Sequence, residues 1–190
     1  MIEDQYKFIS IDIPRTACSE RCRLIAGMPW GEVPEEVMHA KYWREINKHA
    51  KAIEYQQHSP ENFSTYFKFT FVRNPWDRMV SFFHYHQARH GVTDFRRYIT
   101  KNEFGDLNTQ QIDYLVDNNG FILVDFIGRF ENLYEDFGKI CQIINFDGEL
   151  EYIPEKLTAS YWSYYDDKTR RIVAKKFKKD TEYFGYSFVR

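Results

Sequence analysis

The fold class of this 190-residue chain is decided by one stretch, Tyr66-Phe-Lys-Phe-Thr-Phe-Val-Arg-Asn-Pro-Trp-Asp-Arg-Met-Val-Ser81. Its first part, 66–72, is rich in aromatic and β-branched residues and predicts a strand. Its second part predicts a helix, because Asn74 is a good N-cap and Pro75 is the residue type favoured at the first helical position. A strand that leads through a short loop into a helix is typical of α/β proteins.

The helix predicted after Pro75 has two different sides. Apolar residues recur at the i, i+3, i+4 and i+7 spacing of one buried face. At about 100° per residue, polar residues then line the opposite side. The apolar set is Trp76, Met79, Val80 and Phe83, and the polar set is Asn74, Asp77, Arg78 and Ser81. Ser81 is therefore predicted to point away from the hydrophobic stripe.

Two more strand-loop-helix units are predicted elsewhere in the chain. A short apolar run at 6–11 predicts a strand that ends before Pro14, and Ser19 is a good N-cap for a helix over 20–26. The run at 121–127 predicts another strand. It continues through 128–130 into a helix whose inward side carries Leu133, Phe137, Ile140, Cys141 and Ile144.

Further helices are predicted over 34–55, 93–100, 108–116 and 166–183, with an irregular segment at 147–163. The alternation of strands and helices implies parallel neighbours, which need crossover helices. A chain of 190 residues falls within the usual size of one domain. We therefore expect a single α/β domain over residues 1–190, with a central, mainly parallel sheet flanked by helices.

The charge and composition argue against several classes of protein. Lys and Arg number 26 against 28 Asp and Glu, and the formal net charge of -2 argues against nucleic acid or an anionic membrane as the general partner. The amino terminus resembles neither a signal peptide nor a membrane span. The three cysteines, Cys18, Cys22 and Cys141, cannot all pair and lack the spacing of a zinc site. We expect reduced thiols, no bound metal and a cytoplasmic location.

An arginine follows each of the three predicted strands: Arg15, Arg73 and Arg129. In an open, mainly parallel sheet the loops at the carboxyl ends of the strands gather at one edge, where ligands bind. A guanidinium group is always charged and offers forked donors suited to phosphate or sulfate, and nearby helix N-termini add backbone N–H groups. The sequence thus favours a polyanionic ligand. The alternative is that each arginine only pairs with a nearby carboxylate.

The segment 66–81 resembles the 3′-phosphate-binding segment of the sulfotransferase family typified by Golgi carbohydrate sulfotransferases and their bacterial relatives. In that family the arginine that opens Arg-Asn-Pro and the serine that ends the segment hold the 3′-phosphate. These positions correspond to Arg73 and Ser81 here. The resemblance implies a P-loop-kinase-like sulfotransferase fold, with 3′-phosphoadenosine 5′-phosphosulfate (PAPS) as co-substrate.

The segment 11–19, Ile-Asp-Ile-Pro-Arg-Thr-Ala-Cys-Ser, resembles the same family's 5′-phosphosulfate loop, usually written Ile-Pro-Lys-Thr-Ala/Gly-Gly-Thr-Ser. Arg15 replaces the usual lysine, and Cys18-Ser19 replaces part of the Gly-Thr-Ser run. The resemblance implies that the phosphosulfate is bound by Arg15, Thr16, Ala17, Cys18 and Ser19.

Further likenesses to the family lie at 48–54, at 126–131 and near the end of the chain, so the resemblance spans nearly all of it. They suggest that Arg129 and Phe130 approach the adenosine, with the Phe130 ring stacking on the base. The alternative is that Phe130 is an ordinary core residue.

The leading hypothesis is a sulfotransferase that transfers a sulfuryl group from PAPS to a hydroxyl group of a carbohydrate or a small metabolite. The alternative is a non-catalytic module that binds PAPS or adenosine 3′,5′-bisphosphate and has lost transfer, which the departures at Arg15 and Cys18 permit. A nucleotide kinase is disfavoured, because no Gly-x-x-x-x-Gly-Lys-Ser/Thr loop occurs, and the Gly-x-Gly-x-x-Gly pattern of dinucleotide sites is absent too. The oligomeric state is open, a homodimer included.

Transfer of a sulfuryl group needs groups that stabilise negative charge and a base that takes the acceptor proton. We expect Arg15 to stabilise the charge and a histidine to be the base, because histidine has a suitable unperturbed pKa. The resemblance implies His49, since the resembling proteins often place a histidine at this position ahead of the strand. A structural role for His49 is the alternative. The other candidate bases are His39, His58, Glu45 and Glu54.

Overall fold

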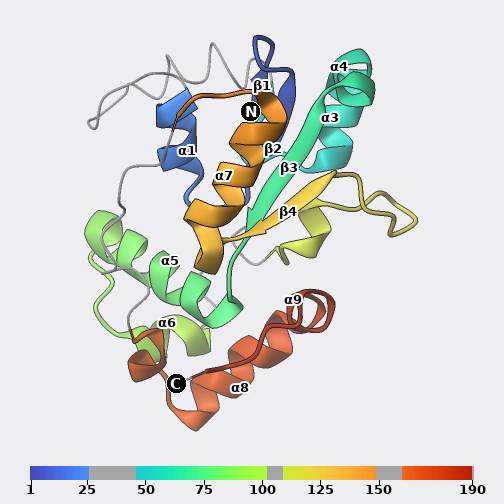
Figure 1. Ribbon diagram of the computed structural model, residues 1–190. Helices are drawn as coiled ribbons and strands as arrows, with labels where there is room; N and C mark the ends of the chain where they lie inside the picture. The colour runs from blue at the N-terminus through green and yellow to red at the C-terminus, as the bar shows by residue number, and fades with distance from the viewer. Residues whose placement is uncertain (26–45, 102–108, 149–159, 190) are drawn as a thin grey trace. The chain divides into compact units, whose positions relative to one another are not determined.

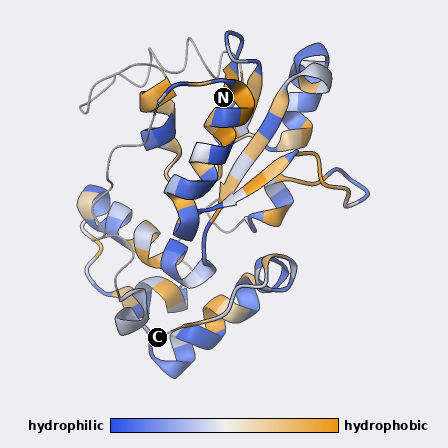
Figure 2. Ribbon diagram, in the orientation of Figure 1, coloured by the Kyte–Doolittle hydropathy of each residue, from blue (hydrophilic) through white to orange (hydrophobic). Residues whose placement is uncertain are grey.

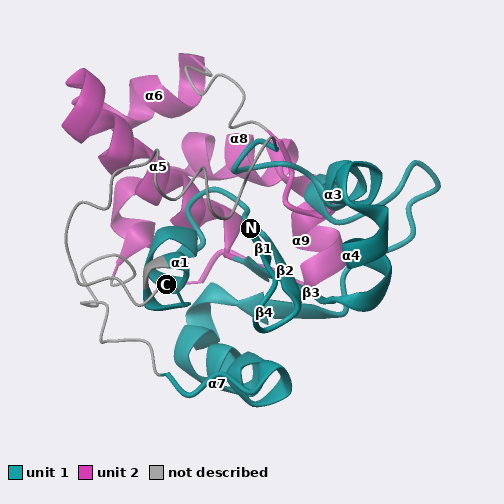
Figure 3. Cartoon of the chain, turned by 90° about the horizontal axis from the view of Figure 1, so that it is seen from above, with its two compact units in different colours: residues 1–72, 113–152 teal, residues 73–112, 153–190 magenta. Residues whose placement is uncertain are grey.

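The computed structural model describes residues 1–25, 46–101, 109–148 and 160–189 (Figure 1). The chain divides into two compact units, each made from two separate segments (Figure 3). Unit 1 is formed by residues 1–72 and 113–152, and unit 2 by residues 73–112 and 153–190. Whether residues 1–190 form a single domain stays a prediction.

Unit 1 contains a sheet in the order β1-β2-β3-β4. Its strands are β1 (Ile2–Glu3), β2 (Phe8–Ile11), β3 (Phe67–Val72) and β4 (Phe126–Arg129). β1 runs antiparallel to β2, whereas β2 and β3 pair in parallel, as do β3 and β4. The predicted α/β class with a mainly parallel sheet is confirmed for the described residues.

β3, the strand predicted at 66–72, supplies much of the core of unit 1. Hydrophobic and hydrophilic residues alternate along its first half (Figure 2). The fully buried Phe69 ring lies 5.4 Å from the ring of Phe8 and 6.4 Å from that of Phe71, measured between centroids. Aromatic residues on neighbouring strands therefore fix the register by packing as well as by the hydrogen-bond ladder.

The helices of unit 1 lie on the segment between β2 and β3 and directly after β4. They are α1 (Cys18–Ile25), α3 (Ala52–His58), α4 (Pro60–Thr65), the 3-10 turn η4 (Phe130–Asn132) and α7 (Leu133–Ile144). A further 3-10 turn, η3, covers Ile112–Tyr114, where the chain passes from the first segment of unit 2 into the second segment of unit 1. The predicted inward side of α7 is confirmed, since all its apolar residues named from the sequence are buried.

Unit 2 is helical in the described residues. Its elements are α5 (Pro75–His90), α6 (Phe95–Lys101), the 3-10 turn η6 (Tyr161–Tyr164), α8 (Asp167–Lys176) and α9 (Lys178–Phe184). The predicted start of α5 is confirmed, because the Asn74 side chain accepts a hydrogen bond from the Trp76 N–H at 3.0 Å and Pro75 takes the first position. The apolar face of α5 packs in one core cluster with residues of α6, α8 and Phe177.

The strand predicted at 121–127 is wrong for most of its length. The Asp117 carboxylate accepts hydrogen bonds from the N–H groups of Asn119 and Phe121, and Gly120 takes a left-handed φ of 87°. This turn leaves the Phe121 side chain 70% exposed, and β4 begins only at Phe126. Arg129 is the last residue of β4, so it lies in the strand and not in a loop after it.

Other boundaries also differ from the prediction. The helix expected over 34–55 is interrupted, because 46–51 form turns before α3, and 26–45 lie outside the described residues. α1 begins at Cys18, so Ser19 lies inside its first turn and is not the N-cap. In the region 108–116 the described residues form only η3, and the helix over 166–183 is broken at Phe177 into α8 and α9.

Gly128 is a position where the close approach of two strands demands glycine. A Cβ atom there would lie 2.6 Å from Cε1 of Phe71, which is far inside van der Waals contact. We expect Gly128→Ala to lower the free energy of unfolding by about 1–3 kcal/mol, measured by urea denaturation. Gly138→Ala is the matched control in the interior of α7, where no described atom lies within 4 Å of the new methyl group. It should stabilise by about 0.5–1 kcal/mol, and equal effects of the two changes would contradict this account.

Candidate functional site

The loop between β2 and α1, residues 12–19, has an unusual backbone. Arg15 and Ala17 take left-handed φ angles of 69° and 61°, although neither is glycine. Between them, Thr16 donates a hydrogen bond from its hydroxyl to the carbonyl of Ile13 at 2.8 Å. Left-handed residues in a tight turn rotate successive N–H groups toward a common side, which is the geometry of anion-binding nests. A loop of this shape that opens a helix can receive a phosphate or sulfate group.

Arg21 holds this loop from the first turns of α1. Its side chain is buried and donates a hydrogen bond to the carbonyl of Thr16, and its Nη2 lies 3.7 Å from Oδ1 of Asp12. The guanidinium also lies 4.4 Å from the centre of the Phe71 ring on β3. One side chain thus connects the start and the middle of the loop to the sheet. Nothing in the local sequence distinguished Arg21 from a surface residue of a helix.

Asp12 is the second anchor of the loop and is fully buried. Its carboxylate accepts hydrogen bonds from the Ser10 hydroxyl at 2.8 Å and from the amino group of Met1 at 3.4 Å. Burial alone would raise the pKa of Asp12, but the charges of the Met1 amino group and Arg21 outweigh it and lower the pKa below its ordinary value. The loop is therefore held by an ionised carboxylate.

His49 lies in a turn before α3, and its ring contacts the same loop. The Nδ1 atom is 2.6 Å from the backbone carbonyl oxygen of Asp12. A carbonyl can only accept, so Nδ1 must carry the proton and donate it. In the neutral ring this leaves the lone pair on Nε2, which is the tautomer that a general base requires. The structure thus connects His49 to the 12–19 loop, as a base would need, although its predicted helical setting is wrong.

The other candidate bases are less well placed or fall outside the described residues. The Glu54 carboxylate accepts a hydrogen bond from the Lys51 N–H at 2.7 Å and so caps α3. His58 is exposed at the last position of α3. His39 and Glu45 lie outside the described residues.

Cys18 and Cys22 are buried beside the loop. Burial is the largest cause that raises the pKa of each thiol, and the charge of Asp12 adds to it. Both thiols therefore stay protonated near neutral pH and serve as small core groups rather than nucleophiles. At the position of Cys18, the N–H group at the start of α1 is the part that can meet an anion.

In unit 2 the start of α5 carries the predicted 3′-phosphate residues. Arg73 is buried, and its Nε donates a hydrogen bond to Oδ2 of Asp77 at 2.7 Å. Ser81 is buried one helical turn beyond Asp77, on the same side of the helix. Buried charged groups need partners, and the Arg73–Asp77 ion pair supplies one here. Gln111 and Asp180, which the sequence did not single out, contact this region as well.

Arg129 and Phe130 end β4 in unit 1. The Arg129 N–H donates to Oδ2 of Asp136 at 2.9 Å, so the first turns of α7 fasten the end of the strand. The Phe130 side chain is only 7% exposed. This burial favours the core role of Phe130 over stacking on a base.

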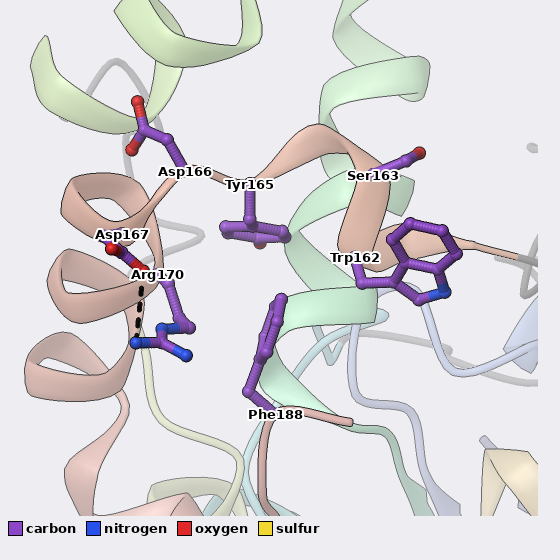
Figure 4. A pocket seen from close by; sticks show the side chains of 7 residues that line it. All are labelled: Trp162, Ser163, Tyr165, Asp166, Asp167, Arg170 and Phe188. Atoms are coloured by element: carbon purple, nitrogen blue, oxygen red, sulfur yellow. Dashed lines mark ion pairs between the residues drawn. The ribbon is translucent and has the colours of Figure 1, made fainter. Parts of the chain in front are cut away.

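A pocket of about 520 Å³ lies within unit 2 (Figure 4). Trp162, 42% exposed, forms one side of it, and the rings of Tyr165 and Phe188 meet edge to face with centroids 5.5 Å apart. Asp167 and Arg170 form an ion pair at 3.3 Å along another side. The remaining lining residues are Ser163 and Asp166. Aromatic faces beside paired donors and acceptors suit a ligand with one apolar face and a rim of hydroxyl groups.

The described residues contain neither a metal-binding group nor a membrane-spanning helix. Among residues 1–25, 46–101, 109–148 and 160–189, no group of three or more His, Cys, Asp or Glu side chains is arranged to hold a metal ion. Within the same ranges no helix has both the length and the apolar character needed to cross a membrane.

The ionised state of Asp12 gives the loop a pH dependence. A carboxylate whose pKa is lowered by folding adds stability above its unfolded pKa of about 3.9 and loses it as the pH falls through the folded value. We expect the wild type to lose about 1–3 kcal/mol more of its free energy of unfolding than Asp12→Asn when the pH is lowered from about 6 to about 2. Urea titrations at each pH measure this. Asp147→Asn, at an exposed carboxylate, is the control that should follow the wild type, and parallel curves for wild type and Asp12→Asn would contradict the prediction.

Comparison with known proteins agrees with the resemblance noted in the sequence. A model of the sulfotransferase family matches residues 1–187. An uncharacterised protein of Archaeoglobus fulgidus is 35% identical over 115 residues, which cover 58% of this chain and 88% of that protein. Human carbohydrate sulfotransferase 9 is 23% identical over 218 residues, covering 94% of this chain and 47% of the human protein.

This chain therefore spans about half the length of the human relative. No solved structure gives a significant match. The family model covers almost every residue, including the 12–19 loop and the segment from β3 into α5. The chain belongs to the sulfotransferase family.

Proposed function

We propose that this chain transfers a sulfuryl group from PAPS to a hydroxyl group of an acceptor. The observation that carries the proposal is the conformation of the 12–19 loop. Arg15 and Ala17 have left-handed φ angles, and Arg21 stabilises the turn through its hydrogen bond to the Thr16 carbonyl. Membership of the sulfotransferase family supports sulfuryl transfer in general. The choice of PAPS as donor is the finer part of the proposal and rests on Arg73 and Ser81.

In this mechanism the two ends of the donor are held by different groups. Arg73 and Ser81 bind the 3′-phosphate, and Arg15 with the N–H groups of residues 16–19 binds the phosphosulfate. The acceptor oxygen forms a bond to sulfur while the bond from sulfur to the bridging phosphate oxygen breaks, and adenosine 3′,5′-bisphosphate leaves. Fixed donors that face the developing charge lower the barrier, as in phosphoryl transfer.

His49 takes the proton that the acceptor hydroxyl loses. Its Nδ1–H is bound by the Asp12 carbonyl, so in the neutral ring the lone pair that would receive that proton is on Nε2. Arg15 stands where the family usually has lysine. Because a guanidinium does not give up a proton at ordinary pH, Arg15 would stabilise charge on the sulfuryl and bridging oxygens without protonating the leaving group.

The acceptor that we propose is a carbohydrate. One of the two relatives is named a carbohydrate sulfotransferase. The pocket beside Trp162 supports this choice, since an aromatic face and the Asp167–Arg170 pair suit a sugar ring and its hydroxyl groups. A cytoplasmic location remains part of the proposal. The second candidate function is a module that binds the nucleotide without transfer, and the replacement of the family lysine by Arg15 favours it.

Nucleotide binding tests the donor. We expect calorimetry to show that adenosine 3′,5′-bisphosphate binds at least tenfold more tightly than adenosine 5′-monophosphate, because only the first can meet Arg73 and Ser81. Ser81→Ala should remove about 1.5–3 kcal/mol, or roughly 10–100-fold, of that preference by deleting a hydrogen bond to a charged group. Ser64→Ala, at an exposed serine of α4, is the control. Equal affinity of the wild type for both nucleotides would refute PAPS as donor.

Kinetics test the base. We expect His49→Ala to lower kcat by about 100-fold or more while leaving the affinity for adenosine 3′,5′-bisphosphate unchanged. His58→Ala is the matched control. A mass-shift screen of oligosaccharide acceptors with PAPS supplies the assay, and tight nucleotide binding without transfer to any acceptor would favour the non-catalytic module.

A further inference from the structure

Gln111 pairs with both backbone polar groups of Arg73. The Arg73 N–H donates to Oε1 of Gln111 at 2.9 Å, and Nε2 of Gln111 donates to the Arg73 carbonyl at 2.8 Å. Both residues are buried and belong to unit 2. The Gln111 amide donates one hydrogen bond to Arg73 and accepts another from it. This pair fixes the orientation of the Arg73 backbone, because a rotation of the backbone would break at least one of the two hydrogen bonds.

Asp180 on α9 holds Gln111 in turn. Its Oδ2 accepts from the Gln111 backbone N–H at 2.9 Å and lies 3.4 Å from Nε2, and its Oδ1 accepts from the Ile112 N–H at 3.0 Å. Asp180 is completely buried. A buried carboxylate that accepts several hydrogen bonds is costly to displace. The short segment at 111–112 is therefore locked to α9.

The result is that Arg73 is fixed at two points along its length. Gln111 fixes its backbone, and Asp77 fixes its side chain through the 2.7 Å hydrogen bond from Nε. A forked guanidinium distinguishes a phosphate from other groups only when its donors are already aligned with the phosphate oxygens. Misalignment of about 1 Å is enough to lose much of such an interaction.

We infer that Gln111 and Asp180 are positioning residues that set the preference for a 3′-phosphorylated nucleotide, acting through Arg73. The inference rests on the proposed function, because it assumes that Arg73 meets the 3′-phosphate. Gln111 and Asp180 do not touch the ligand in this account. Their effect is confined to the affinity contributed by the 3′-phosphate.

The experiment compares nucleotide preference in near-isosteric variants. Gln111→Glu keeps the acceptor for the Arg73 N–H, loses the donor to the Arg73 carbonyl and sets a second carboxylate next to that of Asp180. Gln111→Met keeps a similar side-chain volume, introduces no charge and loses both hydrogen bonds to Arg73. It is the substitute if Gln111→Glu does not fold. Asp180→Asn removes one acceptor and adds a donor that faces backbone N–H groups. Gln142→Glu makes the same chemical change at an exposed position of α7.

The quantity measured is the ratio of the dissociation constants of adenosine 5′-monophosphate and adenosine 3′,5′-bisphosphate, with thermal unfolding followed in parallel. We expect the Gln111 variants and Asp180→Asn to lower this ratio about tenfold or more, with the affinity for adenosine 5′-monophosphate unchanged and Gln142→Glu like the wild type. A purely structural role would lower both affinities or the melting temperature and leave the ratio intact.

Two results would overturn the inference, and they differ in what else they affect. If the wild type itself shows no preference for the 3′-phosphorylated nucleotide, the proposed donor and the inference fail together. If the wild type shows the preference and folded Gln111 and Asp180 variants retain it, the inference alone fails.

Discussion

The parallel pairing of β3 with both β2 and β4 is the constraint on which the rest of unit 1 depends. Parallel neighbours cannot be joined by a hairpin, so the chain must leave each strand at its carboxyl end and return through a helix. The 12–19 loop follows β2 for this reason, and Arg73 is the first residue after β3. Glycine at position 128 lets β4 approach the Phe71 ring closely enough for this pairing.

A pair of oppositely charged groups is buried beside each of the two candidate segments, the 12–19 loop and the start of α5. Asp12 and Arg21 form such a pair in unit 1, and Arg73 and Asp77 form another in unit 2. Buried ion pairs contribute little net stability, because the cost of removing the charges from water offsets their attraction. Their effect is geometric, since an unpaired partner would be costly and few alternative arrangements keep both charges paired. The two segments are thus held in defined shapes at little gain in stability.

The sequence predicted best the features that depend on neighbouring residues. The sequence predicts β3 and the start of α5 because the run of aromatic and β-branched residues, the Asn74 cap and Pro75 are local signals. The start of β4 is placed too early from the sequence, because the apolar run at 121–127 looks like a strand. The turn at 117–120 depends on hydrogen bonds to the side chain of one aspartate, Asp117, and the pattern of apolar residues does not indicate it.

The site shows the same division between local and distant contacts. The 12–19 loop and the Arg73 segment could be found from their motifs, whereas the residues that hold them could not. Gln111 lies 38 residues from Arg73 and 69 from Asp180 along the chain, so no pattern in a short window relates them. Arg21 escaped notice because its role depends on facing Phe71 of a distant strand. Residues that hold the two segments through distant contacts can therefore be identified from the folded structure but not from the local sequence.

The left-handed backbone at Arg15 and Ala17 has a consequence for the thermodynamics of ligand binding. A non-glycine residue in this conformation costs about 1–2 kcal/mol, so the loop would relax if its anchors were removed. Hydrogen bonds from Thr16 and Arg21, both made within the protein, hold it in place. The conformational entropy of the loop is therefore lost during folding and not when an anion arrives, and an incoming anion meets N–H groups that are already oriented.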